Sequence, residues 1–299
     1  MILPKYLSSG DKIAIISTAR KVTIEDVYPA IEIFKSWGLE PILSPNLFET
    51  EHQFAGSDQE RAEDLVWAFK NPDIKAIICA RGGYGTARIL DKFDHAILAS
   101  NPKWFIGFSD VTVLLSLLAK YQIPSIHGIM PLLFSQENAS NSLQSLKKSL
   151  FGNPISIELP PNESNKCGIS EGILIGGNLS ILNNLVGTMA DFEPEGKILF
   201  IEDLDEYYYH IDRMMLHLKL ANKLKNLAGL IIGHFTDLKD NKVSFGKSMI
   251  EIVLDAVKGY NYPVCFDFPT GHQFDNLAVK VGMQTKLEIL TDKVAFYQY

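Results

Sequence analysis

Residues 104–112 read Trp-Phe-Ile-Gly-Phe-Ser-Asp-Val-Thr, and they decide the fold because they join a short apolar strand to a helix. The strand stops at Gly107, and a helical period follows over Asp110–Lys120. Ser109 stands in the turn between them. A nucleophile elbow carries glycine two residues before and two residues after its serine, but Val111 fills the second place here. A serine followed by an acid is also typical of an ordinary helix N-cap, and this stretch alone favours the cap.

A glycine-rich turn at residues 80–86, Ala-Arg-Gly-Gly-Tyr-Gly-Thr, shifts the balance towards a site. It follows the apolar strand 76–79, and three glycines in four residues free the backbone. N–H groups in such a turn can converge on an anion or on a developing oxyanion. The spacing is neither the dinucleotide fingerprint nor a P-loop, so a nucleotide phosphate cradle is the weaker alternative.

Strands and helices alternate through the first half of the chain. Strands are expected at 12–18, 40–43, 76–79, 104–107 and 125–127, and helices at 23–37, 57–69, near Ile89, at 110–120 and at 143–150. This order predicts an α/β fold with a parallel sheet covered by helices on both faces. Ligands of such sheets lie beyond the carboxyl ends of the strands. The glycine turn and Ser109 both lie at that edge.

A polar, breaker-rich segment at residues 151–167 predicts a linker. It would separate an N-terminal α/β domain, 1–150, from a smaller mixed α/β domain, 168–299. In the second domain strands are expected at 172–176, 197–201, 230–233, 264–266, 286–290 and 294–297, and helices from Asn178, at 207–221 and at 248–257.

Composition narrows the class of protein. The chain has 299 residues, 46% of them apolar, which is enough for two cores. Its net charge is −7 and its lysines and arginines are scattered, which argues against nucleic acid as a partner. No leader-like apolar segment and no apolar run of about 18 residues occurs, so we expect an unexported protein that does not enter a membrane. The three cysteines are expected to be buried free thiols in a reducing compartment.

A serine nucleophile needs a base within hydrogen-bond reach, and the base needs an orienting acceptor. His272 is our first choice, because it lies in a breaker-rich loop directly after strand 264–266. His127, which ends a strand, is the second. His210 and His217 lie seven apart on a helix, which indicates packing or surface positions and lacks the spacing of a zinc pair.

Glu202 is the preferred carboxylate. It ends the apolar strand 198–201, where an acid is costly unless it is paired. The following acids, Asp203, Asp205 and Glu206, are expected to face solvent or to cap the next helix.

The order Ser109, Glu202, His272 is the chain order of the α/β-hydrolase triad, with the linker between the first two residues. The site would therefore lie at the interface of the two domains, a common place for a ligand pocket.

Five segments together resemble the LD-carboxypeptidases, the muramoyltetrapeptide carboxypeptidase family of serine peptidases, over nearly the whole chain. They are Arg81-Gly82-Gly83-Tyr84-Gly85, Gly107-Phe108-Ser109-Asp110-Val111-Thr112, Gly176-Gly177-Asn178-Leu179, Phe200-Ile201-Glu202-Asp203 and Thr270-Gly271-His272. Each segment is modest alone, but their joint occurrence in this order is specific.

The resemblance implies an N-terminal domain like that of class I glutamine amidotransferases, and a site without metal or cofactor. It implies Ser109 as the nucleophile, Glu202 as the orienting acid and His272 as the general base. It also implies an oxyanion hole from the backbone N–H groups of Gly83 and Asp110.

The implied reaction releases the terminal D-alanine of a murein tetrapeptide, cut after L-lysine or meso-diaminopimelate, in cytoplasmic cell-wall recycling by a homodimer. Three alternatives stay open. One is a branch that resembles microcin-immunity peptidases and cuts peptidyl-nucleotide antibiotics. Another is a non-catalytic two-domain protein that binds a peptide or an anion. The third is the role of Arg81, which would either bind the carboxylate of the substrate or form a structural ion pair within the protein.

Overall fold

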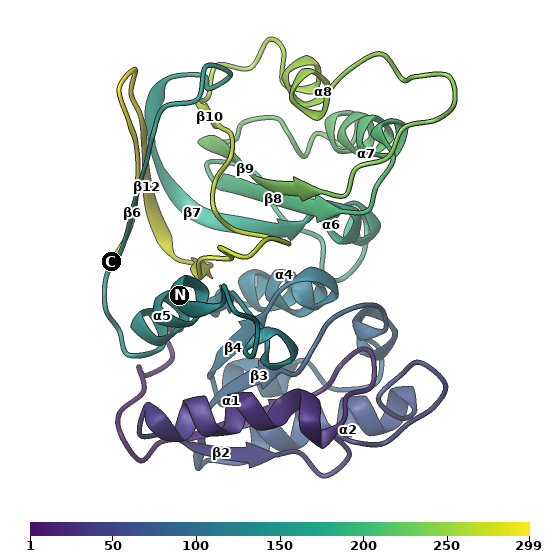
Figure 1. The fold of residues 1–299 in the computed structure, drawn as a ribbon, viewed down its shortest axis with the longest axis vertical. Coiled ribbons are helices and arrows are strands. Elements are labelled where there is room, and N and C mark those ends of the chain that lie inside the picture. The colour runs from purple at the N-terminus through teal and green to yellow at the C-terminus, as the bar shows by residue number, and fades with distance from the viewer.

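Two β-sheets, one above the other, organise the computed structural model, which describes residues 1–299 (Figure 1). The first sheet has the order β11-β5-β4-β3-β1-β2, and every pairing in it is parallel except that of β11 with β5. Its strands are β1 (Lys12–Ile16), β2 (Glu40–Leu43), β3 (Ile74–Cys79), β4 (Trp104–Gly107), β5 (Ser125–His127) and β11 (Val279–Val281). Its helices are α1 (Ile24–Ser36), α2 (Asp58–Lys70), α3 (Ala96–Ser100), α4 (Thr112–Lys120) and α5 (Ser140–Leu150), with short 3₁₀ turns η1 (Thr86–Ile89), η2 (Ser109–Val111) and η3 (Pro131–Leu133).

Both faces of the first sheet are buried at its centre, which explains why β1, β3 and β4 consist largely of apolar residues. Ile13 and Ile15 of β1 belong to one core, which also contains Phe34 of α1. Ala14 and Ile16 belong to the other core, with residues of α2 and α4. Alternate side chains of a strand point to opposite faces, so one apolar strand supplies both cores.

The second sheet is mixed and has the order β10-β9-β8-β7-β12-β13-β6. The pairings among β7, β8, β9 and β10 are parallel, and the rest are antiparallel. Its strands are β6 (Ile155–Leu159), β7 (Gly168–Asn178), β8 (Ile198–Leu204), β9 (Gly229–Thr236), β10 (Val264–Cys265), β12 (Gln284–Ile289) and β13 (Val294–Gln298). Helices α6 (Leu179–Leu185), α7 (Tyr208–Leu220) and α8 (Met249–Ala256) pack on its parallel part.

The two halves are joined by more than one crossing of the chain. Helix α4 of the first half packs against β7 and α6 of the second (Figure 1). After β10 the chain returns to the first half, where β11 adds an antiparallel strand beside β5. The loop 266–278 between β10 and β11 therefore passes from one sheet to the other.

The structure confirms the predicted α/β class and differs from the sequence expectations in detail. The predicted linker contains β6, whose alternating burial is hidden in the sequence by the breakers that flank it. Strand β11 was not expected, because its middle residue, Lys280, is charged and yet completely buried. Cys79 and Cys265 are buried as expected, but the prediction for Cys167 was wrong, since it is exposed.

Candidate active site

Ser109 occupies a strained turn at the carboxyl end of β4. Its φ angle is +60°, in the left-handed region that a non-glycine residue seldom adopts. An N-cap residue has extended backbone instead, so the alternative of an ordinary cap does not hold. A Cβ on Gly107 would lie 2.5 Å from a methyl carbon of Val111, so this tight turn requires glycine at that position. The half-buried serine is thus held by its own local backbone.

The glycine turn after β3 packs against this serine. A Cβ on Gly82 would lie 3.2 Å from the Cβ and 3.4 Å from the Oγ of Ser109. Gly83 is exposed with φ +117°, and a Cβ there would lie 2.6 Å from the Cδ of Arg20. The absence of a side chain at Gly82 therefore lets the main chain of the turn lie close to the serine hydroxyl.

His272 and Glu202 form a buried pair, although 70 residues separate them in the chain. The Nδ1 of His272 lies 2.5 Å from Oε2 of Glu202, whose side chain is fully buried, while that of His272 keeps 13% exposure. The imidazole lies next to the serine turn, since its ring centroid is 4.9 Å from that of Phe108. With Nδ1 engaged by the acid, Nε2 is the nitrogen left for a hydroxyl.

Glycines allow the histidine loop to pass directly over the acid. A Cβ on Gly271, at φ +123°, would lie 2.8 Å from the Cβ of Glu202. A Cβ on Gly233 would lie 2.4 Å from the carbonyl oxygen of Thr270, which accepts a hydrogen bond from the N–H of His234. The Thr-Gly-His motif can be recognised in the sequence. The need for glycine at position 233 cannot, because it arises only from the close approach of β9 to the histidine loop.

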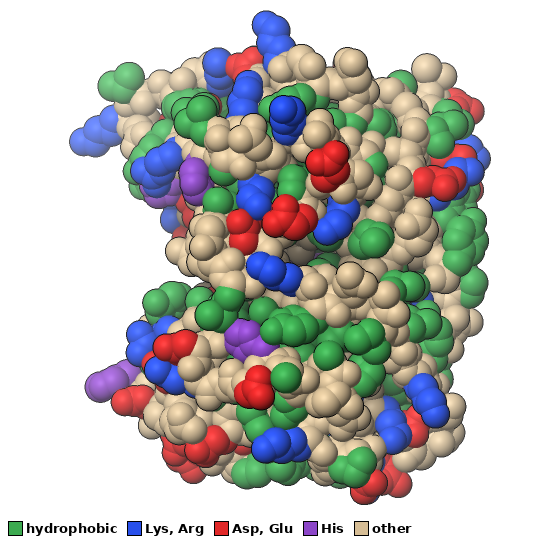
Figure 2. Space-filling model, turned by 180° about the vertical axis from the view of Figure 1, so that it is seen from behind, with side chains coloured by type: hydrophobic (Ala, Val, Ile, Leu, Met, Phe, Trp, Pro, Cys, Tyr) green, Lys and Arg blue, Asp and Glu red, His purple; other side chains and the backbone are tan.

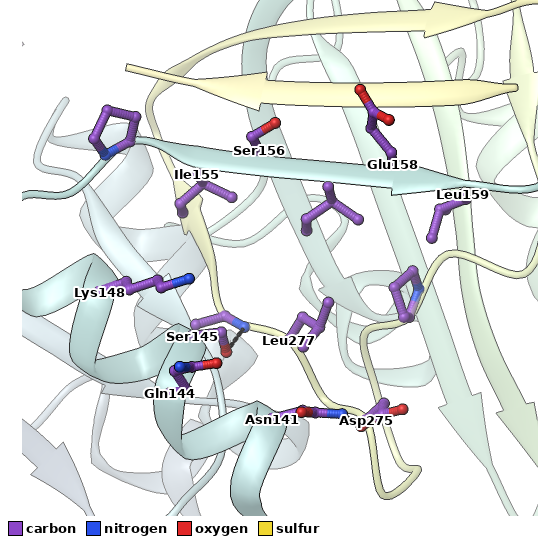
Figure 3. A pocket seen from close by; sticks show the side chains of 14 residues that line it. Asn141, Gln144, Ser145, Lys148, Ile155, Ser156, Glu158, Leu159, Asp275 and Leu277 are labelled. Carbon is purple, nitrogen blue, oxygen red and sulfur yellow. Dashed lines mark hydrogen bonds between the residues drawn. The ribbon is translucent and has the colours of Figure 1, made fainter.

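Helix α5 of the first half also holds this loop, as Figure 3 shows. Ser142 Oγ donates to the carbonyl of Phe274, and Asn141 Nδ2 donates to Asp275 Oδ1. The N–H of Ala278 donates to the Oγ of Ser145. A pocket of about 540 Å³ lies between α5, β6 and the loop, and its lining contains none of the three predicted triad residues. Both halves of the molecule therefore position His272.

Electrostatics keep the acid charged and the histidine basic. Burial opposes ionisation of Glu202, but the positive charge of His272 and the hydrogen bond between the two side chains outweigh it and lower the pKa of Glu202. Burial also lowers the pKa of His272, but the carboxylate of Glu202 outweighs that effect and raises it. The pair is therefore an anion that holds and orients a protonatable ring.

Asp203 corrects one expectation. It is buried rather than solvent-facing, and it ties β8 to the end of β7 and the first turn of α6. Its carboxylate accepts hydrogen bonds from Asn178 Nδ2 and from the N–H of Ser180. The N–H of Asn178 in turn donates to Thr112 Oγ1 of the first half. Burial and the neighbouring charge of Glu202 raise the pKa of Asp203 to about 7.

The remaining candidates are placed as follows. His127 is fully buried beside Glu202. His210 of α7 pairs with Glu206, which precedes that helix, and His217 is exposed on α7. Arg81 has no carboxylate partner and only a 3.4 Å contact with the carbonyl of Lys21, so the ion pair weighed for it is not formed.

No three His, Cys, Asp or Glu side chains are grouped so that they could hold a metal ion. No helix combines the length and the apolar character that a membrane crossing requires. Figure 2 shows that the surface seen from behind is indented between the two halves, which leaves room for solvent or a ligand between them.

Sequence comparison places this geometry in a family. The profile of the LD-carboxypeptidase N-terminal domain matches residues 13–128, and that of the C-terminal domain matches residues 171–287. The chain is 32% identical to the murein tetrapeptide carboxypeptidase of Pseudomonas aeruginosa over 93% of both chains. It is also 32% identical to the probable murein peptide carboxypeptidase of Bacillus subtilis, over 95% of this chain and 91% of that one. The chain belongs to the LD-carboxypeptidase family.

Solved structures agree with this membership. The LD-carboxypeptidase fold described here superposes on the muramoyltetrapeptide carboxypeptidase of Oxalobacter formigenes with a TM-score of 0.89 at 31% identity, covering 96% of this chain and 98% of that one. The microcin C7 self-immunity protein MccF has the same fold, with a TM-score of 0.89 at 22% identity over 100% and 99% of the two chains. Membership makes the chain a serine-type carboxypeptidase, which excludes the alternative of a binding protein without catalysis.

Proposed function

We propose that this LD-carboxypeptidase releases the terminal D-alanine of murein tetrapeptides, with Ser109 as the nucleophile, His272 as the base and Glu202 as the orienting acid. The observation that carries the proposal is the buried 2.5 Å contact between His272 and Glu202, next to a serine turn at φ +60°. The names of the relatives in Pseudomonas aeruginosa and Oxalobacter formigenes support the substrate. The scissile bond would join L-lysine or meso-diaminopimelate to D-alanine.

The first step follows from which nitrogen of His272 is occupied. Glu202 accepts the Nδ1–H, which fixes the ring and its tautomer and leaves Nε2 as a base. Nε2 takes the proton of Ser109 Oγ while the oxygen attacks the carbonyl carbon, and the carbonyl oxygen becomes an oxyanion. The N–H groups of Gly83 and Asp110 would receive that negative charge.

Collapse of the intermediate completes the cycle. His272 gives its proton to the nitrogen of the leaving D-alanine, and the acyl group stays on Ser109. A water then loses a proton to the same Nε2, attacks the ester and releases the tripeptide. Because the serine turn belongs to the first half and the acid to the second, the reaction takes place where the halves meet.

The microcin-type reaction is the alternative for the same residues. The likeness to MccF, at 22% identity, supports the shared fold alone, whereas relatives named for murein peptides share 31–32% of residues with this chain. That difference favours the murein substrate.

The decisive assay uses two tetrapeptides that differ only at the last centre, D-alanine and L-alanine. We expect mass loss of alanine from the D-terminal peptide only, and covalent labelling of Ser109 by a fluorophosphonate. Labelling without alanine release from either the lysine or the diaminopimelate peptide would reject the murein substrate. Cleavage of an aminoacyl sulfamoyl nucleoside would then support the microcin-type alternative.

Location and assembly stay predictions from the family resemblance. We propose a cytoplasmic homodimer, which cell fractionation and light scattering of the purified chain would test. A purely monomeric species at micromolar concentration would contradict the second part.

A further inference from the structure

His127 is a buried imidazole without a hydrogen-bond partner. It ends β5, its side chain has no exposure, and neither Nδ1 nor Nε2 is bonded. Phe108 and Phe200 pack against its ring at centroid distances of 5.7 and 5.0 Å, each in an edge-on arrangement. Buried polar groups without a partner are rare, so this one requires an explanation.

The nearest polar group is itself incompletely bonded. Glu202 uses Oε2 to hold His272, while its Oε1 is buried and has no hydrogen bond. The Nε2 of His127 lies 4.0 Å from that Oε1. This distance is too long for a direct bond, but a shift of about 1 Å would close it. Two unbonded atoms of opposite polarity thus face each other in the interior.

We propose that His127 is a positioning residue of the active site, which donates its Nε2–H to Oε1 of Glu202 and so holds the carboxylate between two imidazoles. It makes no hydrogen bond to Ser109. A carboxylate fixed at both oxygens cannot rotate away from His272 when the ring takes up the serine proton. The proposal rests on the proposed function only in taking His272 as the base of Ser109.

The other ionisable neighbours of Glu202 do not supply this contact. Asp203 is an acid whose oxygens are already bonded to Asn178, Ser180 and the adjacent backbone. His234 senses the charge of Glu202 but has no hydrogen bond to it. Besides His272, which holds Oε2, His127 is the only basic side chain within 4.0 Å of the Glu202 carboxylate.

The test compares side chains of different reach at position 127. The amide nitrogen of glutamine can occupy the place of Nε2, asparagine is too short to reach it, and phenylalanine keeps the ring but has no donor. We expect fluorophosphonate labelling of Ser109 to slow by about 10–100-fold in His127→Phe and His127→Asn, the effect of losing one bond to a charged group. His127→Gln should recover most of the rate. With a cleavable tetrapeptide, kcat should fall and KM should stay unchanged.

A titration that needs no substrate separates this proposal from the proposed function. Without the second donor, the carboxylate attracts the imidazolium of His272 more strongly. The pKa of His272, followed by NMR, should therefore rise by about one pH unit in His127→Phe and stay near the wild-type value in His127→Gln. Failure of alanine release would reject the murein substrate and leave this titration unaffected.

Phe200→Leu is the control for an effect of packing alone, because it loosens the apolar wall around His127 and leaves the imidazole nitrogens in place. We expect that variant to lose thermal stability with little change in the pKa of His272. The proposal would be overturned by a folded His127→Asn protein that labels as fast as wild type with an unchanged pKa of His272. It would also be overturned by a glutamine variant no better than the asparagine variant.

Discussion

The serine turn and the acid–histidine pair are built in different ways. Ser109 is held by residues within a few positions of itself, through a glycine at 107 and a positive φ. The His272–Glu202 pair joins residues 70 positions apart. It depends on strand β8, on two glycines, and on the loop 266–278, which is hydrogen-bonded to α5. The nucleophile therefore depends on local backbone geometry, whereas its activation depends on the integrity of the whole fold.

The largest expected effect comes from removing the hydroxyl of Ser109, the residue that is held by local backbone geometry. Ser109→Ala should lower kcat/KM by at least about 10⁴-fold, because members of a triad act as one unit. Stability should stay close to wild type, since alanine carries the same Cβ in the same strained turn. Steady-state kinetics and thermal unfolding measure both. A variant with near-normal turnover would exclude Ser109 as the nucleophile.

Removing the charge of Glu202, the acid of the long-range pair, should reduce activity somewhat less than the loss of Ser109. Glu202→Gln keeps the shape but loses the anion, and we expect kcat to fall by about 10³–10⁴-fold. The pKa of His272 should then drop below its ordinary value, because burial would act without the opposing carboxylate. NMR titration of the imidazole reports it. An unchanged pKa would show that Glu202 does not govern the histidine.

Backbone packing behind the pair offers a stability test. A Cβ on Gly176, at φ +130°, would lie 1.9 Å from the carbonyl oxygen of Phe200. Gly176→Ala should therefore cost about 3 kcal/mol or more of the free energy of unfolding, since the strands must separate. Gly246 is the matched control, with φ +82° and nothing within 4 Å. Its change to alanine should cost only about 1–2 kcal/mol. Equal losses in urea unfolding would contradict the packing argument.

The pH dependence gives the smallest expected effect. Only neutral His272 can accept the serine proton, and Glu202 raises its pKa, so the acid limb of kcat/KM should lie above the ordinary histidine value of about 6.5. The contribution of His272 to folding stability changes with pH in the opposite direction. That contribution is fully present below the ordinary pKa of histidine, and it is lost as the pH rises through the raised pKa of His272 in the folded state. An acid limb below 6 would contradict the assigned direction.

Local patterns in the sequence predict much of the fold. Strands 40–43, 104–107 and 125–127 have the predicted bounds, because a glycine or a proline stands at or within two residues of each end. Other positions resisted prediction, since their environment comes from distant segments. Asp203 is buried with hydrogen bonds to the end of β7 and the start of α6, and Lys280 is buried against aromatic rings. Nothing near either residue in the chain indicates that burial.

The sequence by itself determined most of the order of strands and helices, apart from β6 and β11, as well as the strand-to-helix turn at Ser109 and the motifs that indicate the family. Each of these depends on residues close together in the chain. Only the tertiary structure decided that Glu202 meets His272, that α5 holds the histidine loop and that His127 faces the free carboxylate oxygen. Such contacts between distant segments depend on the twist of the two sheets and on how closely the loops that connect their strands approach one another. Those distances are set by the packing of the entire chain, and no short segment encodes them.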